Sequence, residues 1–194
     1  MEQIPLISIP ENDQSSRTLI GRKGNNSLLI MTSHANPLEE DNDIVKRIDK
    51  IASANGYDGW ILWNLTPERN SHSGLLKNTY HNSDQATHRG LLSVLLDNEL
   101  WGFKNVWLAW GENILEKKYL QEQAYLTLDS QIRMELNYWY SKKTANGHPA
   151  HLETPFRKRR IDGVETTDLH SFKIKPYIRK IRPYGWNSEF TLSN

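Results

Sequence analysis

The sequence has 194 residues, of which 37% are hydrophobic and 10% aromatic, and its formal net charge is +1. This length predicts one domain with a sizeable core and a short appendage. The absence of cysteine excludes disulfide bonds, thiolate nucleophiles and cysteine-ligated zinc.

Targeting and cofactor signals are also lacking in the sequence. No run approaches the roughly 20 apolar residues of a membrane-spanning helix, and the N-terminal segment lacks the basic and then apolar pattern of a signal peptide. There is neither a glycine-rich phosphate loop nor the GxSxG pattern of a serine hydrolase. We therefore expect a cytoplasmic protein with no membrane partner and no cofactor.

The charge is unevenly distributed along the chain. Residues 157–194 contain nine Lys or Arg against four Asp or Glu, a local charge of +5, whereas the rest contains 15 against 19, or −4. A basic tail on a mildly acidic body indicates a polyanion as partner. A tail that only increases solubility is the alternative.

The first elements in chain order are short. Residues 1–16 are polar with two prolines, which predicts an irregular N-terminal segment. Residues 17–21 predict a short edge strand, and the Lys-Gly-Asn-Asn turn at 23–26 predicts a hairpin. Residues 27–32 (SLLIMT) form the first continuous apolar run, which is typical of a buried strand.

A helix and a second buried strand follow. Apolar residues recur at helical spacing over 43–54, after the N-cap candidates Asp41 and Asn42 and before an Asn-Gly stop signal. A strand over 60–64 then completes a strand–helix–strand unit. This unit predicts parallel strands joined by a right-handed crossover.

The stretch from Gly59 to Arg69 (GWILWNLTPER) is the centre of the prediction. Its short apolar run is typical of a strand buried on both faces, and it ends abruptly in polar residues. The run at 27–32 ends in the same way. Ligands of open α/β sheets bind just beyond the carboxyl ends of the strands, so these polar ends predict a binding site. A solvated loop that caps the next helix is the alternative.

The second half of the chain continues the alternation of strands and helices. We expect an α/β fold in three layers, with a central, mostly parallel sheet flanked by helices. Residues 17–155 form this domain and residues 156–194 form a basic C-terminal extension. The remaining elements are a helix over 84–98, a strand over 106–109, a helix from 112 to 123, a segment at 131–140 that fits either a helix end or a strand, a turn-forming loop with two histidines at 146–151, and a strand at 171–181.

Four short motifs lie along the chain: Asp41-Asn42-Asp43, Asn64-Leu65 with Arg69, Ala109-Trp110-Gly111, and Gly147-His148-Pro149-Ala150-His151. Together they resemble an uncharacterised bacterial and phage family, domain of unknown function 1643. The resemblance covers about residues 17–155 and leaves the tail outside.

The same layout is similar to the uracil-DNA glycosylase superfamily. In that superfamily a first strand ends in a water-positioning Asp or Asn, a second ends in a base-reading Asn, a third carries Leu-Trp-Gly, and a His-Pro-Ser loop supplies the catalytic His. The resemblance implies this fold and a nucleobase site. The matching positions here, in the same order, are Thr32 or Ser33, Asn64 with Asn70-Ser71-His72, Ala109-Trp110-Gly111, and His148-Pro149.

The first motif departs from both families. Thr32 or Ser33 stands where they have Asn or Asp, and the Pro and aromatic residue that follow it there are missing. The sequence therefore leaves open whether the protein turns over a substrate.

Cleavage of an N-glycosidic bond requires a donor aimed at the base oxygen, where negative charge develops. The resemblance assigns this role to His148, and an amide such as Asn64 can read a pyrimidine edge with one donor and one acceptor. Basic residues would hold the backbone phosphates. The predicted site comprises His148, Ser33 and Thr32 as catalytic residues, Asn64, Arg69 and His34 as base-binding residues, and Arg157, Lys158, Arg159 and Arg160 as nucleic-acid-binding residues.

Each assignment has a structural alternative. His148 could only shape its turn, and Asn64 could only cap its own loop. Arg69 could pair with Asp58 or Glu68 instead of a phosphate. His151 lies three residues after His148, but no third metal ligand is evident, so we expect no metal site.

The leading hypothesis is a nucleic-acid-binding, uracil-DNA-glycosylase-like protein that acts on DNA and excises a base, which could be a modified one. A non-catalytic nucleic-acid-binding module on the same scaffold is the second hypothesis. A factor that binds a protein partner, for example in phage–host conflict, is the third.

Overall fold

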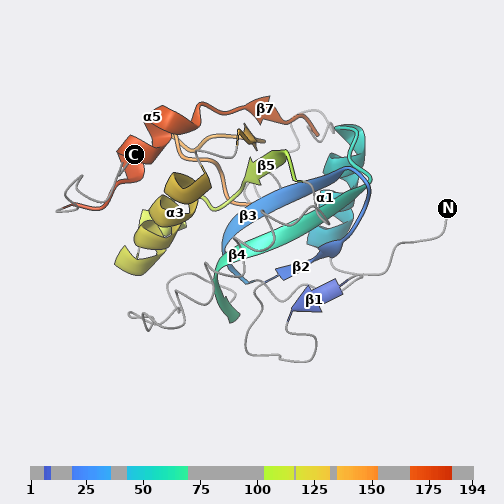
Figure 1. The fold of residues 1–194 in the computed structure, drawn as a ribbon, viewed down its shortest axis with the longest axis horizontal. Coiled ribbons are helices and arrows are strands. Elements are labelled where there is room, and N and C mark those ends of the chain that lie inside the picture. Colours follow the sequence, from blue (N-terminus) through green and yellow to red (C-terminus); the bar gives the residue numbers. More distant parts are fainter. Residues whose placement is uncertain are drawn as a thin grey trace.

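The computed structural model describes residues 7–9, 19–35, 43–69, 103–115, 117–131, 135–152 and 167–184. These residues form a seven-stranded sheet with helices on both faces (Figure 1). The strands are β1 (Ile7–Ile9), β2 (Leu19–Arg22), β3 (Ser27–Ala35), β4 (Gly59–Arg69), β5 (Asn105–Leu108), β6 (Asn137–Tyr140) and β7 (His170–Ser171). The helices are α1 (Asp43–Ala54), the 3₁₀ helix η2 (Glu112–Leu115), α3 (Lys118–Gln131) and α5 (Ile174–Ile181).

The α/β class is confirmed, but the sheet is mixed and not mostly parallel, so that part of the prediction is wrong. Its order is β1-β2-β4-β3-β5-β6-β7. The central strands β4, β3, β5 and β6 are parallel, whereas β1, β2 and β7 pair antiparallel at the margins. Crossover helices build only the parallel centre, and the marginal strands come from the two ends of the chain.

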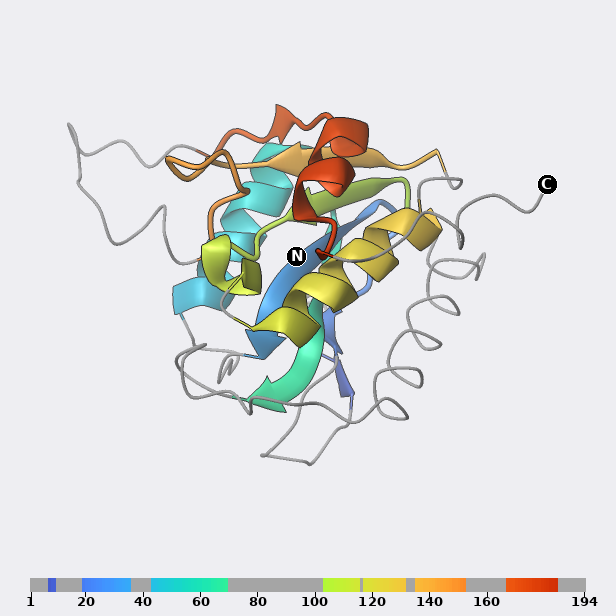
Figure 2. The same ribbon diagram turned by 90° about the vertical axis from the view of Figure 1, so that its left-hand side faces the viewer.

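Side chains of the parallel strands alternate between two cores, one on each face of the sheet. Because β4 and β6 lie on opposite sides of the β3–β5 pair, right-handed crossovers place α1 and α3 on opposite faces. Figure 2 shows α3 and α5 in front of the sheet and α1 behind it. The α1-side core includes Leu28, Ile30, Val45, Ile48, Leu62 and Trp107, and the α3-side core includes Leu29, Met31, Trp63, Leu108, Trp110, Leu128 and Ile181.

The predicted hairpin at residues 23–26 is wrong, because β4 lies between β2 and β3. Asp58 explains this turn. Its carboxylate accepts hydrogen bonds from the backbone N–H of Asn26 at 2.7 Å and of Asn25 at 3.1 Å. A side chain at Gly59 would collide with the backbone of Gly24. The turn therefore crosses directly over the start of β4.

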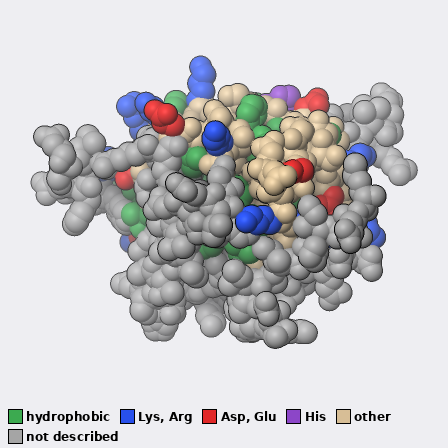
Figure 3. All heavy atoms as spheres, turned by 45° about the vertical axis from the view of Figure 1, so that its right-hand side comes forward, with side chains coloured by type: hydrophobic (Ala, Val, Ile, Leu, Met, Phe, Trp, Pro, Cys, Tyr) green, Lys and Arg blue, Asp and Glu red, His purple; other side chains and the backbone are tan. Residues whose placement is uncertain are grey.

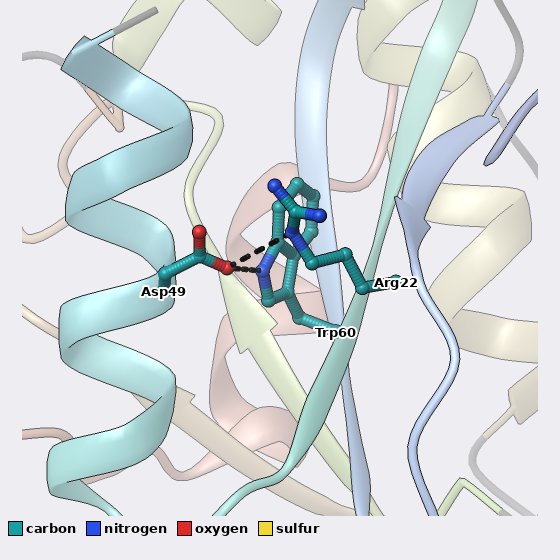
Figure 4. A network of polar contacts seen from close by, with 3 residues as sticks. All are labelled: Arg22, Asp49 and Trp60. Atoms are coloured by element: carbon teal, nitrogen blue, oxygen red, sulfur yellow. Dashed lines mark hydrogen bonds and ion pairs between the residues drawn. The ribbon is translucent and has the colours of Figure 1, made fainter. Parts of the chain in front are cut away.

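A polar contact holds α1 against the sheet (Figure 4). The indole N–H of Trp60 on β4 donates to Oδ1 of Asp49 on α1 at 2.6 Å. Nε of Arg22 on β2 lies 3.5 Å from the same oxygen. One carboxylate thus joins three elements at the edge of the α1-side core, and neutralises the largely buried Arg22.

The predicted strand over 171–181 is also wrong. The described residues there contain only the two-residue β7, followed by the helix α5. Ile174, Tyr177, Ile178 and Ile181 recur at i, i+3, i+4 and i+7, which is the spacing of one helix face. Tyr177, Ile178 and Ile181 are buried in the α3-side core. Residues assigned to the basic extension therefore contribute to the sheet and to this core.

Other predicted elements have mixed outcomes. The helix over 43–54 and its parallel flanking strands are confirmed, and so is the strand near 106–109. The segment at 131–140 holds both alternatives, since α3 ends at Gln131 and β6 starts at Asn137. β1 shows that residues 1–16 include a strand. The predicted helix over 84–98 lies outside the described residues.

Candidate functional site

The four parallel strands end at one edge of the sheet, which we call the carboxyl edge. The chain passes from β3 to β4 on one side and later places β5 on the other side of β3. The strand order therefore reverses between β3 and β5, and ligands of open α/β sheets bind beyond the carboxyl ends at such a reversal.

The predicted histidine loop lies at this point. We call residues 143–151 the His148 loop. Gly111 N–H donates to Pro149 O at 2.9 Å, and Leu152 N–H donates to Ala109 O at 3.2 Å. Ala109 N–H in turn donates to Met31 O at 2.8 Å. The loop thus adjoins the end of β5, one strand away from the predicted residues that follow Met31.

Hydrogen bonds within the loop fix the backbone of His148. Thr144 N–H donates to His148 O at 2.8 Å, and His148 N–H donates to the Thr144 hydroxyl at 3.2 Å. Gly147 has a φ of +75°, a conformation that favours glycine. Lys143 and Pro149 form an antiparallel bridge. The loop is therefore a closed turn that sets the direction of the imidazole.

The imidazole of His148 is buried against α5. His148 is only 2% exposed. Its Nδ1 lies 3.1 Å from the hydroxyl oxygen of Tyr177. The indole N–H of Trp110 donates to the same hydroxyl at 3.0 Å. The Phe172 ring packs against Tyr177 with centroids 4.9 Å apart. Tyr177 therefore connects the predicted catalytic imidazole to two further aromatic residues, Trp110 and Phe172.

Two hydrogen bonds of Asn146 join the His148 loop to α5 and to η2. The ammonium of Lys180 on α5 donates to Asn146 O. The side-chain amide of Asn146 donates to the Glu112 carboxylate on η2 at 3.0 Å. The His148 loop is thus held between η2 and α5.

Burial, and then the nearby Lys180 ammonium, lowers the pKa of His148, although the Glu112 carboxylate acts in the opposite direction. Hydrogen bonding, first of all with Thr144, lowers the pKa of Glu112. Burial raises the pKa of Tyr177. At neutral pH the site therefore holds a neutral imidazole, a neutral phenol and an ionised Glu112.

The predicted residues Thr32 and Asn64 are bonded to each other. They are register partners on β3 and β4, and the Thr32 hydroxyl donates to Oδ1 of Asn64 at 2.7 Å. Both are buried. By alternation along the strands they lie on the α1 side of the sheet. Ser33, also buried, lies on the α3 side, as does His148.

The structure therefore brings His148, Ser33, Thr32 and Asn64 to one edge but places them on two faces. His34 pairs in the sheet with Thr66, beyond Asn64, and Arg69 pairs with Ala35 at the last register position of β3 and β4. Asp58 precedes the other end of β4, about 36 Å along the strand from Arg69 at the usual rise per residue, and its carboxylate accepts from Asn25 and Asn26 N–H. Arg157, Lys158, Arg159 and Arg160 lie outside the described residues.

Sequence reasoning missed Tyr177, the partner of the imidazole. The helical spacing of the apolar residues on α5 would have predicted that Tyr177 faces inward, but not that it meets His148. Among the described ranges, no group of three His, Asp or Glu side chains is arranged to hold a metal ion. In the same ranges, no helix combines the length and apolar character needed to cross a membrane.

These observations define an α/β protein with a mixed sheet and a histidine loop at the strand reversal of its carboxyl edge. The chain belongs to the family described as protein of unknown function (DUF1643), which it matches over residues 17–151. No curated protein and no solved structure matches it. The family match includes the whole His148 loop and ends at its last residue, so Tyr177 and the rest of α5 lie outside the match.

Proposed function

We propose that the protein binds nucleic acid, with DNA as the favoured partner, and cleaves the N-glycosidic bond of a base held at the carboxyl edge. The single observation that carries this proposal is the position of His148. It is a buried, neutral imidazole beside the strand reversal, where α/β sheets bind ligands.

The proposed cleavage requires a hydrogen-bond donor to the base that is not itself a strong acid. When the bond between C1′ and the base nitrogen breaks, its electron pair stays on the base. Water then bonds to C1′ and releases a proton. A neutral imidazole N–H can stabilise the anionic base by hydrogen bonding to its oxygen, and burial strengthens this interaction. The Lys180 ammonium adds a favourable positive potential.

The other predicted residues enter the proposal with roles limited by their contacts. Ser33 is on the same face as His148 and is the better candidate for the water side. The Thr32 hydroxyl already donates to the Asn64 carbonyl oxygen, which limits the contacts that Asn64 can make with a base. A base that meets both Asn64 and His148 would have to lie across the edge of the sheet. Base contacts remain the proposed role of Arg69 and His34. Phosphate contacts remain the proposed role of Arg157–Arg160.

The test is an assay for abasic sites in duplexes that carry uracil or modified pyrimidines. The wild type should release a base, and His148→Ala should reduce the rate by roughly 10²–10⁴-fold, the usual contribution of a positioned proton donor. His170→Ala removes an exposed imidazole and should leave the rate unchanged. No cleavage of any tested base would contradict the proposed reaction.

A second candidate function, nucleic-acid binding without catalysis, is favoured by the charge around the His148 loop. Figure 3 shows exposed Lys and Arg side chains at the upper left and near the centre of one face, with acidic side chains beside those at the upper left. Together with Thr32 or Ser33 in place of the Asn or Asp of the similar families, these cations suit a binder that does no chemistry. The exposed cations of the loop region and α5 are Lys142, Lys143, Lys173, Lys175, Arg179 and Lys180.

A further inference from the structure

We propose that Tyr177 is a positioning residue that holds His148 in the tautomer with its proton on Nε2. This inference rests on the proposed function, because it specifies how the donor of that site is oriented. It assigns a role to α5, which lies outside the segment that matches the family.

The proton positions follow from counting donors and acceptors. The indole nitrogen of Trp110 can only donate, and it donates to the Tyr177 oxygen at 3.0 Å. The hydroxyl proton of Tyr177 is then available to Nδ1 of His148 at 3.1 Å. If Nδ1 accepts this proton, the neutral ring carries its own proton on Nε2.

The opposite arrangement leaves a buried group unsatisfied. If Nδ1–H donated to Tyr177, the phenol oxygen would accept from both Trp110 and His148. Within the described part of the chain, Tyr177 has no hydrogen-bond partner besides these two. Its own proton would then lack an acceptor there, which costs about 1–3 kcal/mol for a buried polar group.

Packing keeps the hydroxyl of Tyr177 in place. The Trp110 and Tyr177 rings are stacked with centroids 6.3 Å apart, and Phe172 and His148 meet the Tyr177 ring edge-on at 4.9 and 5.6 Å. The charged groups near the imidazole are Lys180 on α5 and Glu112 on η2, which act in opposite directions on it. The hydrogen-bonded group Trp110–Tyr177–His148 is therefore fixed by ring packing among its own members and with Phe172, which follows β7.

The experiment measures the tautomer directly. Two-bond ¹H–¹⁵N correlation spectra of the full-length protein near pH 8 distinguish protonated from unprotonated imidazole nitrogens. The His148 signal among the seven histidines is assigned by its loss in His148→Asn. The wild type should show the proton on Nε2. A proton on Nδ1 in the wild type would overturn the inference, whatever any variant does.

Two variants test the cause. Tyr177→Phe keeps the ring and removes the hydroxyl, so it should shift His148 toward a mixture of tautomers. Trp110→Phe removes a donor to the Tyr177 oxygen but gives the Tyr177 hydroxyl proton no other acceptor, so His148 should keep its proton on Nε2. Tyr140→Phe is the matched control, since Tyr140 packs on Phe172 and His170, and it should leave the spectrum unchanged. If Tyr177→Phe folds and retains a pure Nε2–H form, Tyr177 does not set the tautomer.

The spectra need no ligand, which separates this inference from the proposed function. If the wild type cleaves a base, Tyr177→Phe should lower the rate by roughly 10-fold or more but by no more than His148→Ala does. If the wild type cleaves nothing while the tautomer responds as expected, the proposed reaction is wrong and the role of Tyr177 stands.

Discussion

At the scale of single residues, the contacts of a buried polar side chain indicate whether its role is structural or functional. The Thr32 hydroxyl donates a hydrogen bond to the Asn64 side chain between two central strands. Asn64, the predicted base-reading amide, therefore also contributes to the stability of the sheet. His148 is different, because its ring contacts another element and its backbone is fixed by its own loop.

The Thr32–Asn64 bond should be measurable as a coupling energy. Thr32→Val keeps the shape of the side chain and removes the donor, and should lower the free energy of unfolding by about 1–3 kcal/mol. A double-mutant cycle with Asn64→Ala in urea denaturation should give a coupling of roughly 0.5–3 kcal/mol. Additive effects of the two substitutions would show that the hydrogen bond adds no stability.

The lowered pKa of His148 predicts a pH dependence of stability. The unfolded chain takes up a proton near the ordinary histidine pKa of about 6.5, whereas the native state takes it up only at lower pH. Between these values the unfolded state binds more protons. The free energy of unfolding therefore falls as the pH drops below about 6.5.

His148→Asn should remove this part of the pH dependence, and urea denaturation at pH 5 and pH 7 measures it. His170→Asn leaves His148 in place and should keep the wild-type difference between the two pH values. Equal losses of stability in all three proteins on acidification would contradict the assignment.

At the scale of elements, α5 is the least expected part of the fold. Over eight residues, an apolar pattern with Phe172 and Ile174 two residues apart also fits a strand, so the sequence alone did not distinguish the two periods. The α3-side core stabilises the helix, because Tyr177, Ile178 and Ile181 all pack into this core from one helix face. The side-chain amide of Gln121 on α3 also donates to Ile181 O at 3.1 Å.

Truncation on the buried face of α5 should therefore be costly. Ile181→Ala should lower the free energy of unfolding by about 2–5 kcal/mol, because Ile181 is fully buried. Arg179→Ala on the exposed face of the same helix should change it by less than about 0.5 kcal/mol. Chemical denaturation measures both. A small effect of Ile181→Ala would mean that α5 is not docked in solution.

At the scale of the whole molecule, charge and fold act together. Within the described residues, the basic C-terminal part is not separate from the domain, because α5 packs into the α3-side core. α5 carries exposed cations on one side and core residues on the other, and its tyrosine reaches the His148 loop. A polyanion bound along α5 would therefore lie next to the carboxyl edge.

Charge reversal on α5 should weaken binding to nucleic acid. Lys175→Glu combined with Arg179→Glu should raise the Kd for a DNA duplex and reduce the slope of log K against log salt by about 1–2, since each phosphate contact contributes about 0.9. Lys46→Glu with Lys50→Glu makes the same charge change on exposed positions of α1 and should leave the slope unaltered. Fluorescence anisotropy over a salt series measures both.

Equal weakening by the two double variants would show that only the net charge matters, and no binding by the wild type would contradict a nucleic-acid partner. The two double variants differ only in which face carries the change. The comparison therefore tests the position of the surface and not simply the charge of the protein.

The sequence by itself determined the α/β class, the buried strands β3, β4 and β5, the helix α1 and the parallel pairing of β3 with β4. These follow from hydrophobic period and from short connections, which are local properties of the chain. The same local signals marked Thr32, Ser33, Asn64 and His148 as polar positions at strand ends and in a turn.

Only the tertiary structure decided that β4 inserts between β2 and β3, that Thr32 and Asn64 face away from the side of His148, and that Tyr177 holds the imidazole. Successive side chains of a strand point to opposite faces of the sheet. Adjacent residues such as Thr32 and Ser33 therefore lie on different faces once the register is set. The contact between His148 and Tyr177 spans 29 residues, and it forms because α5 packs into the α3-side core, which no local pattern encodes.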